Sequence, residues 1–255
     1  MNITHDVIGK AGQLGNQMFQ YAQLVGVKYK LGCDILFENQ MRKQSYLFDF
    51  FDMNEYVFVD EFKYKQTYCE KHFHFDEKVF DIKEDTNFAG YFQTEKYFTH
   101  CEDIIRKEFT FKNHIQDNVL DKLKKYENKT LVSIHVRRGD YMAYPKIHPL
   151  CSLDYYNIAM NYFDDVQFLC FSNDIEWCKQ NIKAENIDYF SNDLEVDMCM
   201  ISKCHHHIIA NSTFSWWGAW LSNHKNKKIF APNLWFGPDG FKDFYDIYGK
   251  NFIII

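Results

Sequence analysis

The fold of this chain is decided at residues 131–141, which read Leu-Val-Ser-Ile-His-Val-Arg-Arg-Gly-Asp-Tyr. The stretch begins as an apolar, β-branched run, which is typical of a buried strand, and it ends in a cluster of charges. Side chains alternate along a strand, so His135 and Arg137 point to one face of the sheet and Arg138 to the other. Gly139 then permits a turn that other residues resist.

Two adjacent arginines at the end of a buried strand indicate a site for an anion. In an open α/β sheet, ligands bind at the carboxyl ends of the strands. The forked guanidinium group matches a phosphate or a diphosphate in shape and charge. The alternative is a structural ion pair, for instance between Arg138 and Asp140, and this stretch alone leaves both interpretations open.

Composition sets the broad class of the protein. At 255 residues, the chain can form one large or two small domains with a sizeable core. Its formal net charge of −6 argues against a nucleic acid or an anionic membrane surface as partner, so any anion site is local. No uninterrupted apolar run reaches the roughly 18 residues of a membrane span, and the first six residues do not resemble a signal peptide. Peripheral attachment to a membrane stays open.

The eight cysteines suggest a cytoplasmic protein. No two of them form a Cys-x-x-Cys pair, which argues against a zinc ribbon or a thioredoxin-like site. Several lie in apolar surroundings and are interpreted as reduced core thiols.

The amino-terminal part predicts a β–loop–α–β opening. We expect a strand, a glycine-punctuated loop, a helix and a second strand at residues 3–8, 9–17, 18–31 and 34–38. The glycine spacing does not match the Gly-x-Gly-x-x-Gly fingerprint, and no Gly-Lys-Ser/Thr follows it, so a P-loop is excluded. The loop either lets the Asn16 amide approach a ligand or is simply a tight connection of small residues.

Residues 40–120 have no clean periodicity. We expect short strand or turn pieces at 49–53 and 57–60, a half-buried strand at 72–75, a strand from Phe88, and helices at 96–111 and 112–129. His72 and His74 could in principle hold a metal, but no carboxylate or cysteine completes the ligand set. A domain boundary is placed near Lys125.

The second half alternates strands with helices, which is the signature of a doubly wound parallel sheet. The expected strands after residue 136 are 166–171, 187–190, 205–210 and 228–232, and Ser152 is a candidate N-cap for the first helix. Polar groups follow three strands, at His135 and Arg137, at Ser172-Asn-Asp174, and at Ser212-Thr213. They would line the ligand edge of the sheet and hold a nucleotide diphosphate without a metal. The aromatic tail 233–255 is expected to pack back on the body.

Three stretches together resemble the inverting α-1,2-fucosyltransferases of glycosyltransferase family 11. They are Gly12-Gln-Leu-Gly-Asn-Gln-Met-Phe-Gln-Tyr-Ala22, His135-Val-Arg-Arg-Gly-Asp-Tyr141 and Ile209-Ala-Asn-Ser-Thr-Phe-Ser-Trp-Trp-Gly-Ala-Trp-Leu221, with a weaker match at residues 171–177. The resemblance implies a GT-B fold, in which two Rossmann-like α/β domains face a cleft. Residues 1–125 would form the acceptor-side domain and residues 126–255 the GDP-fucose-binding domain.

The same resemblance implies an activity. The family transfers L-fucose from GDP-β-L-fucose, with inversion and without a metal or other cofactor, usually to the 2-hydroxyl of a galactose. Arg137 would hold the β-phosphate, and Arg138 would also belong to the donor site. The remaining donor-binding positions are His135 and Asp140 beside the arginines, Asn173 or Asp174 facing guanine, and Ser212, Thr213 and Phe214 closing on the diphosphate.

The acceptor side and the general base are also implied by relatives. The loop of protein O-fucosyltransferases resembles residues 12–17, which places Asn16 beside the reacting centre together with Gly12, Gln13 and Gly15. Gln13 stands where those relatives carry an arginine. The α-1,6-fucosyltransferases have a glutamate base shortly after the arginine motif. The corresponding loop here has no acid, and His148 is its only candidate near neutral pH.

The sequence is also compatible with two other functions. A transferase of the same fold could use a different nucleotide sugar. A non-catalytic glycan-binding protein could instead use tryptophans as sugar-stacking surfaces, namely Trp216, Trp217, Trp220 and Trp235. The first three lie at helical spacing in an apolar segment, which favours core packing.

Overall fold

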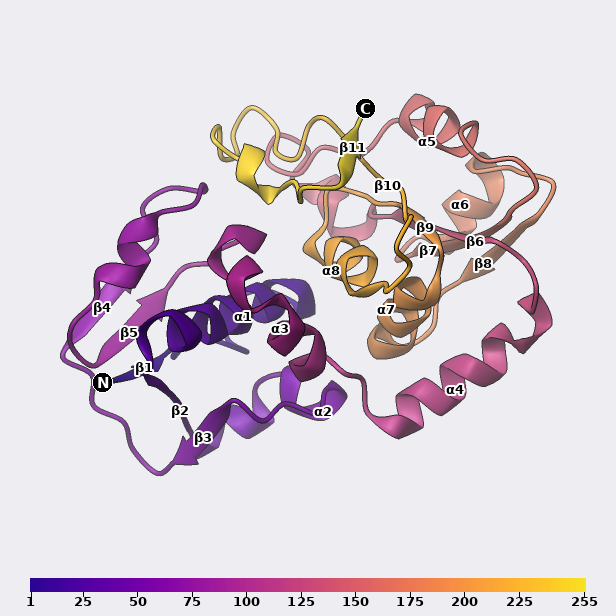
Figure 1. Cartoon of the computed structure of the whole chain (residues 1–255). Coiled ribbons are helices and arrows are strands. Elements are labelled where there is room, and N and C mark those ends of the chain that lie inside the picture. Colours follow the sequence, from indigo (N-terminus) through magenta and orange to yellow (C-terminus); the bar gives the residue numbers. More distant parts are fainter. The chain divides into compact units, whose positions relative to one another are not determined.

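The structure is a computed structural model that describes all 255 residues, and the chain forms two compact units. The first contains Met1–Lys112 and Asp243–Gly249, and the second contains Asn113–Lys242 and Lys250–Ile255. Each unit is built on one parallel β-sheet with helices packed on it (Figure 1). The predicted architecture of two Rossmann-like domains is therefore confirmed, and the predicted cleft stays a prediction.

The units do not divide where the sequence suggested. The boundary was expected after Lys125, but the structure places it between Lys112 and Asn113. The cause is helix α4 (Asn113–Leu123), which packs against α7 (Leu194–Lys203) of the second unit. The buried residues of α4, Ile115 and Val119, supply an apolar face for this contact.

The sheet of the first unit has the strand order β3-β2-β1-β5-β4, and all its pairs are parallel. Ile3 of the central strand pairs with Ile35 on one side and with Thr86 on the other. The strands are β1 (Asn2–Thr4), β2 (Asp34–Glu38), β3 (Tyr56–Val59), β4 (Gln66–Cys69) and β5 (Thr86–Ala89).

Helix α1 (Leu14–Leu31) is the main helix of this unit and begins four residues before its expected start. It is buried almost all round, because apolar and amide side chains fill its first three turns. Gly32 ends it in the left-handed conformation, where its N–H bonds the carbonyl of Lys28 at 2.8 Å. Gly26 lies against the carbonyl oxygen of Tyr97, where a Cβ would be only 2.0 Å away.

Several expectations for the middle region were wrong. Residues 72–75 form a bend and a loop instead of a strand, and the edge strand lies earlier, at β4. His74 pairs with Asp243 at 2.7 Å, and the His72 ring stacks on it. The piece at 49–53 is partly helical as α2 (Leu47–Phe50), and the long helix expected at 96–111 is broken into shorter segments. These are η3 (Glu95–Tyr97), η4 (Thr99–Cys101) and α3 (Glu102–Glu108).

The remaining short helices are η1 (Asn39–Lys43), η2 (Glu77–Asp81), η5 (Lys124–Tyr126), η6 (Gly139–Ala143) and η7 (Tyr245–Ile247). Helix α4 and η5 together replace the single helix expected at 112–129.

The sheet of the second unit has the order β11-β10-β9-β6-β7-β8 and is also entirely parallel. Its strands are β6 (Leu131–Val136), β7 (Gln167–Ser172), β8 (Ile187–Phe190), β9 (His206–Ile208), β10 (Ile229–Ala231) and β11 (Phe252–Ile254). All six residues of β6 are buried, as expected for a strand that is covered on both faces. The tail therefore contributes an edge strand, whereas the sequence predicted only packing.

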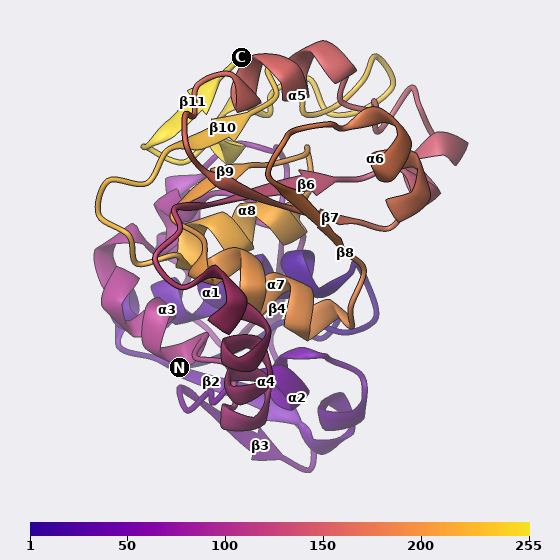
Figure 2. The same cartoon turned by 90° about the vertical axis from the view of Figure 1, so that its right-hand side faces the viewer.

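Helices cover both faces of this sheet (Figures 1 and 2). Helices α5 (Leu153–Met160) and α6 (Ile175–Asn181) pack on the face of Val132, Ile134 and Val136. Helices α7 and α8 (Thr213–Leu221) cover the other face, where the His135 ring contacts Phe214. The predicted alternation along the central strand is thus confirmed. Ser152 caps α5 as predicted, because its hydroxyl accepts the Tyr155 N–H at 3.1 Å.

The tryptophans belong to the core. Trp216 and Trp217 are fully buried, and Trp220 and Trp235 are 5% and 2% exposed. They offer little surface on which a sugar could stack. Helices long and apolar enough to cross a bilayer are absent from the structure.

Candidate functional site

Arg137 follows the last residue of β6 and enters the turn that η6 forms at the carboxyl edge of the sheet. Its Nη2 is 2.9 Å from Oδ2 of Asp140, and its Cζ is 5.6 Å from the centroid of the Tyr141 ring. The Nε of Arg137 is buried and has no hydrogen-bond partner. This guanidinium therefore keeps donor capacity beyond its single ion pair.

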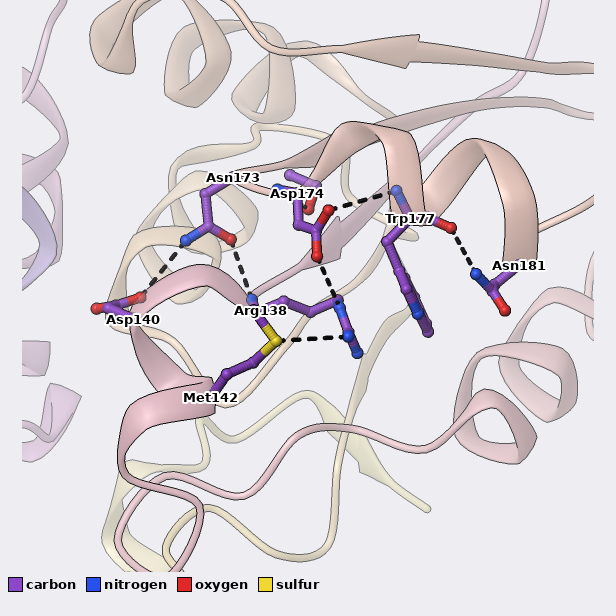
Figure 3. Close-up of polar contacts among 8 residues, drawn as sticks. Arg138, Asp140, Met142, Asn173, Asp174, Trp177 and Asn181 are labelled. Atoms are coloured by element: carbon purple, nitrogen blue, oxygen red, sulfur yellow. Dashed lines mark hydrogen bonds and ion pairs between the residues drawn. The ribbon is translucent and has the colours of Figure 1, made fainter.

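Arg138 is held quite differently (Figure 3). Its Nε is 3.0 Å from Oδ2 of Asp174, and its Cζ is 3.9 Å from the centroid of the Trp177 ring. Asp174 also caps α6, where its Oδ1 accepts the Trp177 N–H at 3.3 Å. The charge of Arg138 is thus already balanced, and its contacts tie the arginine turn to the start of α6.

Asn173 connects the two ends of the arginine turn. Its Oδ1 accepts the backbone N–H of Arg138 at 3.0 Å, and its Nδ2 donates to Oδ1 of Asp140 at 3.4 Å (Figure 3). A Cβ on Gly139 would lie 2.4 Å from that Nδ2, so a side chain there would displace the amide. The ion pair suggested between Arg138 and Asp140 does not form, because each residue pairs with a different partner.

His135 is an uncharged member of the site. It is buried against Phe214, with 5.4 Å between ring centroids, and its Nδ1 has no partner. Burial, assisted by the positive charge of Arg137, lowers the pKa of His135 to about 3. The imidazole is therefore neutral near pH 7 and adds no positive charge of its own.

The hydroxyl-rich turn lies beside the arginine turn. Asn211 and Ser212 connect β9 to α8, and β9 is the neighbour of β6 in the sheet. The Tyr141 hydroxyl donates to the carbonyl oxygen of Asn211 at 3.0 Å, which joins the two turns directly. Helix α8 begins at Thr213, so its amino-terminal end and the partial positive charge of that end lie at this edge.

His148 belongs to the same loop region. Its ring stacks on Tyr141 with 4.6 Å between centroids and contacts Phe236 at 5.8 Å. Burial lowers the pKa of His148, while the charges of Asp140 and Arg137 have opposite and smaller effects. A neutral imidazole at pH 7 can accept a proton, which is what a general base requires.

The first unit holds the other predicted residues. Asn16 is half-buried in the first turn of α1, and its Oδ1 accepts from Nε2 of Gln93 at 2.9 Å. Gly12 has a φ of +82°, and a Cβ there would lie 2.5 Å from Nδ2 of Asn16. Gly12 and Gln13 are exposed and Gly15 is buried. The loop is thus a tight turn that packs onto Asn16.

The turn that carries Gln93 is also stabilised by buried polar contacts. Glu70 accepts the backbone N–H groups of Tyr91 and Phe92 at 2.7 and 2.9 Å. Nε2 of Gln20 donates to the carbonyl oxygen of Gly90, which His5 Nε2 also contacts. These contacts hold Phe92 at a φ of +52°, which an L residue rarely adopts.

The comparisons with known proteins identify the family. The model of glycosyl transferase family 11 matches residues 3–255. This chain belongs to glycosyltransferase family 11. An α-1,2-colitosyltransferase of Escherichia coli is 34% identical over 269 residues, covering 89% of this chain and 90% of the relative. The human galactoside α-(1,2)-fucosyltransferase 1 is 28% identical over 267 residues, covering 89% of this chain and 72% of that enzyme.

Solved structures agree on the fold of this family 11 enzyme. The fucosyltransferase NodZ from Bradyrhizobium superposes with a TM-score of 0.57 at 11% identity, covering 85% of this chain and 92% of NodZ. POFUT1 in its apo form gives a TM-score of 0.54 at 11% identity, covering 90% and 97% of the two chains. The fold is therefore that of the GT-B fucosyltransferases.

In this family 11 glycosyltransferase, the second unit brings together nearly all the predicted donor-site residues. One guanidinium with spare donors, a helix start and two hydroxyl-bearing residues form an edge suited to an anion. Sets of three or more His, Cys, Asp or Glu side chains that could hold a metal ion do not occur in the structure.

Four residues that organise the site were not selected from the sequence: Tyr141, Trp177, Asn211 and Gln93. The first three lie inside the motifs that indicated the family, so their position was visible but their partners were not. Gln93 ends the Phe88–Gln93 stretch, for which the sequence predicts only a strand.

Proposed function

We propose that this enzyme transfers L-fucose from GDP-β-L-fucose to the 2-hydroxyl of a β-linked galactose in a glycan or glycolipid. The reaction proceeds with inversion and needs no metal or other cofactor. The observation that carries the proposal is the placement of Arg137 beside the Ser212 turn on adjacent parallel strands. Relatives named for α-1,2 transfer of either colitose or fucose support the linkage.

The transfer is a single displacement at C1 of fucose. The acceptor oxygen forms a bond to C1 as the bond from C1 to the β-phosphate oxygen breaks, and its electron pair leaves with GDP. Arg137 stabilises the charge that grows on the departing diphosphate, which accelerates the step because the interaction strengthens toward the transition state. Ser212, Thr213 and the start of α8 hold the same group.

The acceptor proton needs a recipient. His148 takes it in this proposal, since burial favours its neutral form. If the bond to the leaving group breaks well ahead of attack, the proton is lost late and a weak base is sufficient. Asn16 hydrogen-bonds the acceptor, with Gly12, Gln13 and Gly15 forming its loop, and the first unit is the acceptor-side domain.

The remaining donor residues divide into two groups. Asn173 or Asp174 faces guanine. Both side chains also have partners in the protein, since Asn173 bonds Arg138 and Asp140, and Asp174 bonds Arg138 and the start of α6. His135, Arg138 and Asp140 orient the site, and Phe214 supports His135.

A second candidate donor is a GDP-linked dideoxy sugar. The 34% identity with the α-1,2-colitosyltransferase over most of both chains favours it. A non-catalytic glycan-binding protein is disfavoured, because the tryptophans it would need are buried.

A cytoplasmic location, with peripheral contact to a membrane when the acceptor is a glycolipid, fits the free thiols. All eight cysteines are unpaired, and six of them are buried.

The test is a transfer assay with GDP-fucose and GDP-colitose against a panel of β-galactosides, followed by linkage analysis of the product. We expect an α-1,2 product, inhibition by GDP but not by UDP, and full activity in a chelator. A different linkage, or turnover of a uridine-linked sugar instead, would contradict the proposal.

A further inference from the structure

One buried carboxamide connects three loops at the carboxyl edge of the second sheet. Asn211 is 2% exposed, and its Nδ2 donates to the carbonyl oxygens of Pro149 and Trp235, each at 3.0 Å. Its Oδ1 accepts from the thiol of Cys151 at 3.6 Å, and its own carbonyl oxygen accepts from Tyr141. Both amide hydrogens are therefore used within the protein.

The three loops follow the neighbouring strands β10, β9 and β6. The loop after β6 carries Arg137 and His148, and Pro149 is the residue next to His148. The loop after β10 carries Trp235, next to the Phe236 ring that contacts His148. Asn211 itself directly precedes Ser212. The group proposed to hold the diphosphate and the group proposed to accept the proton are thus connected through one side chain.

We propose that Asn211 is a positioning residue for the transfer reaction. Its carboxamide fixes the loop of Arg137 and His148 against the turn of Ser212 and Thr213. The proposal rests on the function proposed above. The Asn211 side chain is buried and its amide hydrogens are used, so it acts through these loops and does not touch the substrate.

The chemistry of the amide explains why other residues would not serve. Alanine at 211 would leave the carbonyls of Pro149 and Trp235 without their donor. Aspartate keeps the shape but places an oxygen against both carbonyl oxygens. Two backbone bonds, from Gly237 to Ile147 and from Asp239 to Lys146, still join the outer parts of the loops in either variant. The variants are therefore expected to fold with a locally loosened edge.

The experiment compares Asn211→Ala and Asn211→Asp with Ser222→Ala. Ser222 is a matched control, since it is 2% exposed, donates to the carbonyl oxygen of Cys204 at 3.0 Å, and lies at the far end of α8. Kinetics are measured below the thermal midpoint of every variant. We expect kcat/KM to fall on the order of 10²-fold in both Asn211 variants, because small misplacements of reacting groups are costly. The control should keep its kcat/KM.

A double-mutant cycle separates positioning from general destabilisation. Ser212→Ala is made alone and together with Asn211→Ala. If Asn211 holds the Ser212 turn in place, Ser212→Ala should lower kcat/KM clearly in the parent and little in the Asn211→Ala background. Equal fold-changes in both backgrounds, or an Asn211→Asp enzyme with parental kcat/KM, would overturn the proposal.

Hydrogen exchange tests the same claim without any donor. Amides in residues 144–150 and 235–240 should exchange faster in Asn211→Ala and at the parental rate in Ser222→Ala. Unchanged exchange in these loops would also overturn the proposal. If exchange accelerates while the parent protein transfers no sugar from GDP-fucose, then the proposed function fails and the connection made by Asn211 stands.

Discussion

The guanidinium of Arg138 lies over the indole of Trp177, with 3.9 Å from Cζ to the ring centroid, and pairs with Asp174 at 3.0 Å. Arg137, its neighbour in sequence, has one ion pair and an unpartnered Nε. Consecutive side chains at the end of a strand point to opposite faces of the sheet, so the two arginines have different neighbours. The structure thereby separates a structural arginine from one that is available to a ligand.

Arg137→Lys should keep the fold and lose on the order of 10²-fold or more in turnover, because a planar fork becomes a point charge. The measurement is kcat with GDP-fucose beside a thermal melt of the same preparation. Unchanged kinetics would remove Arg137 from the mechanism.

Arg138→Gln should act mainly on stability. The substitution leaves the Asp174 carboxylate without its cation and removes the stack on Trp177, at a cost of about 1–3 kcal/mol in the free energy of unfolding. Urea unfolding of both arginine variants checks this, since Arg137→Lys should show the smaller loss. The interpretation fails if Arg138→Gln unfolds like the parent.

Gly139→Ala should reduce activity by displacing the amide of Asn173, which would otherwise lie 2.4 Å from the new Cβ. The displaced amide loses its bonds to Arg138 and Asp140. If the displaced amide is the cause, Gly139→Ala should lower kcat clearly in the parent and little further in an Asn173→Ser background, where that amide is already absent. An equal loss of kcat in both backgrounds would show that the clash with Asn173 is not the cause.

Gln93→Leu should lower kcat without changing the affinity for GDP. Gln93 fixes the orientation of the Asn16 amide in the first unit, whereas the proposed nucleotide site lies in the second. Calorimetric titration with GDP provides the control for intact donor binding. A weaker GDP affinity with normal turnover would be the opposite of the expected result.

Stability should fall as the pH drops below 6.5. Burial lowers the pKa of His135 to about 3 and that of His5 to about 4, so the unfolded chain binds these protons first. The stability is fully present above pH 6.5 and is lost progressively toward pH 3–4, with about 2 kcal/mol lost per histidine by pH 5. Urea unfolding at pH 7.5 and 5 measures the difference, and His5→Gln should reduce it.

Two further histidines should also lower the stability of the fold as the pH falls. Nδ1 of His205 accepts the N–H of Leu131, and Nδ1 of His206 accepts the N–H of Lys228. Protonation would remove both of these hydrogen-bond acceptors, which lie at the starts of β6 and β10. Burial lowers the pKa of both imidazoles, so these two hydrogen bonds are also lost only below the ordinary pKa of histidine. A flat profile between pH 7.5 and 5 would contradict the assignment of neutral histidines.

Much of the second unit could be predicted because parallel strands are covered on both faces and appear as continuous apolar runs. The strand ending at His135 and Arg137 is the clearest case. The half-buried pattern at His72–Phe75 was misleading, because alternation there comes from histidines paired on the surface with each other and with Asp243. The unit boundary depended on the packing of α4 against α7, which no local pattern reveals.

The residues of the candidate site likewise divide into those that the sequence predicts and those that it does not. Arg137, Ser212 and Asn16 could be selected because their chemistry is unusual for their position. Trp177, Asn211 and Gln93 could not, since each matters through partners 24 or more residues away, such as Asn211 through Pro149 and Trp235 or Gln93 through Asn16. Contacts between residues so far apart in the sequence form only in the folded chain, so a local sequence pattern cannot predict them.

Neither compact unit is encoded by one continuous segment of the gene. Asp246 completes the first unit by binding the Phe75 N–H and Lys96, and a few residues later β11 extends the second sheet. A chimaera that exchanges donor specificity between relatives therefore needs three junctions, after residues 112, 242 and 249. A single crossover after residue 112 would leave the first unit with a foreign segment at residues 243–249.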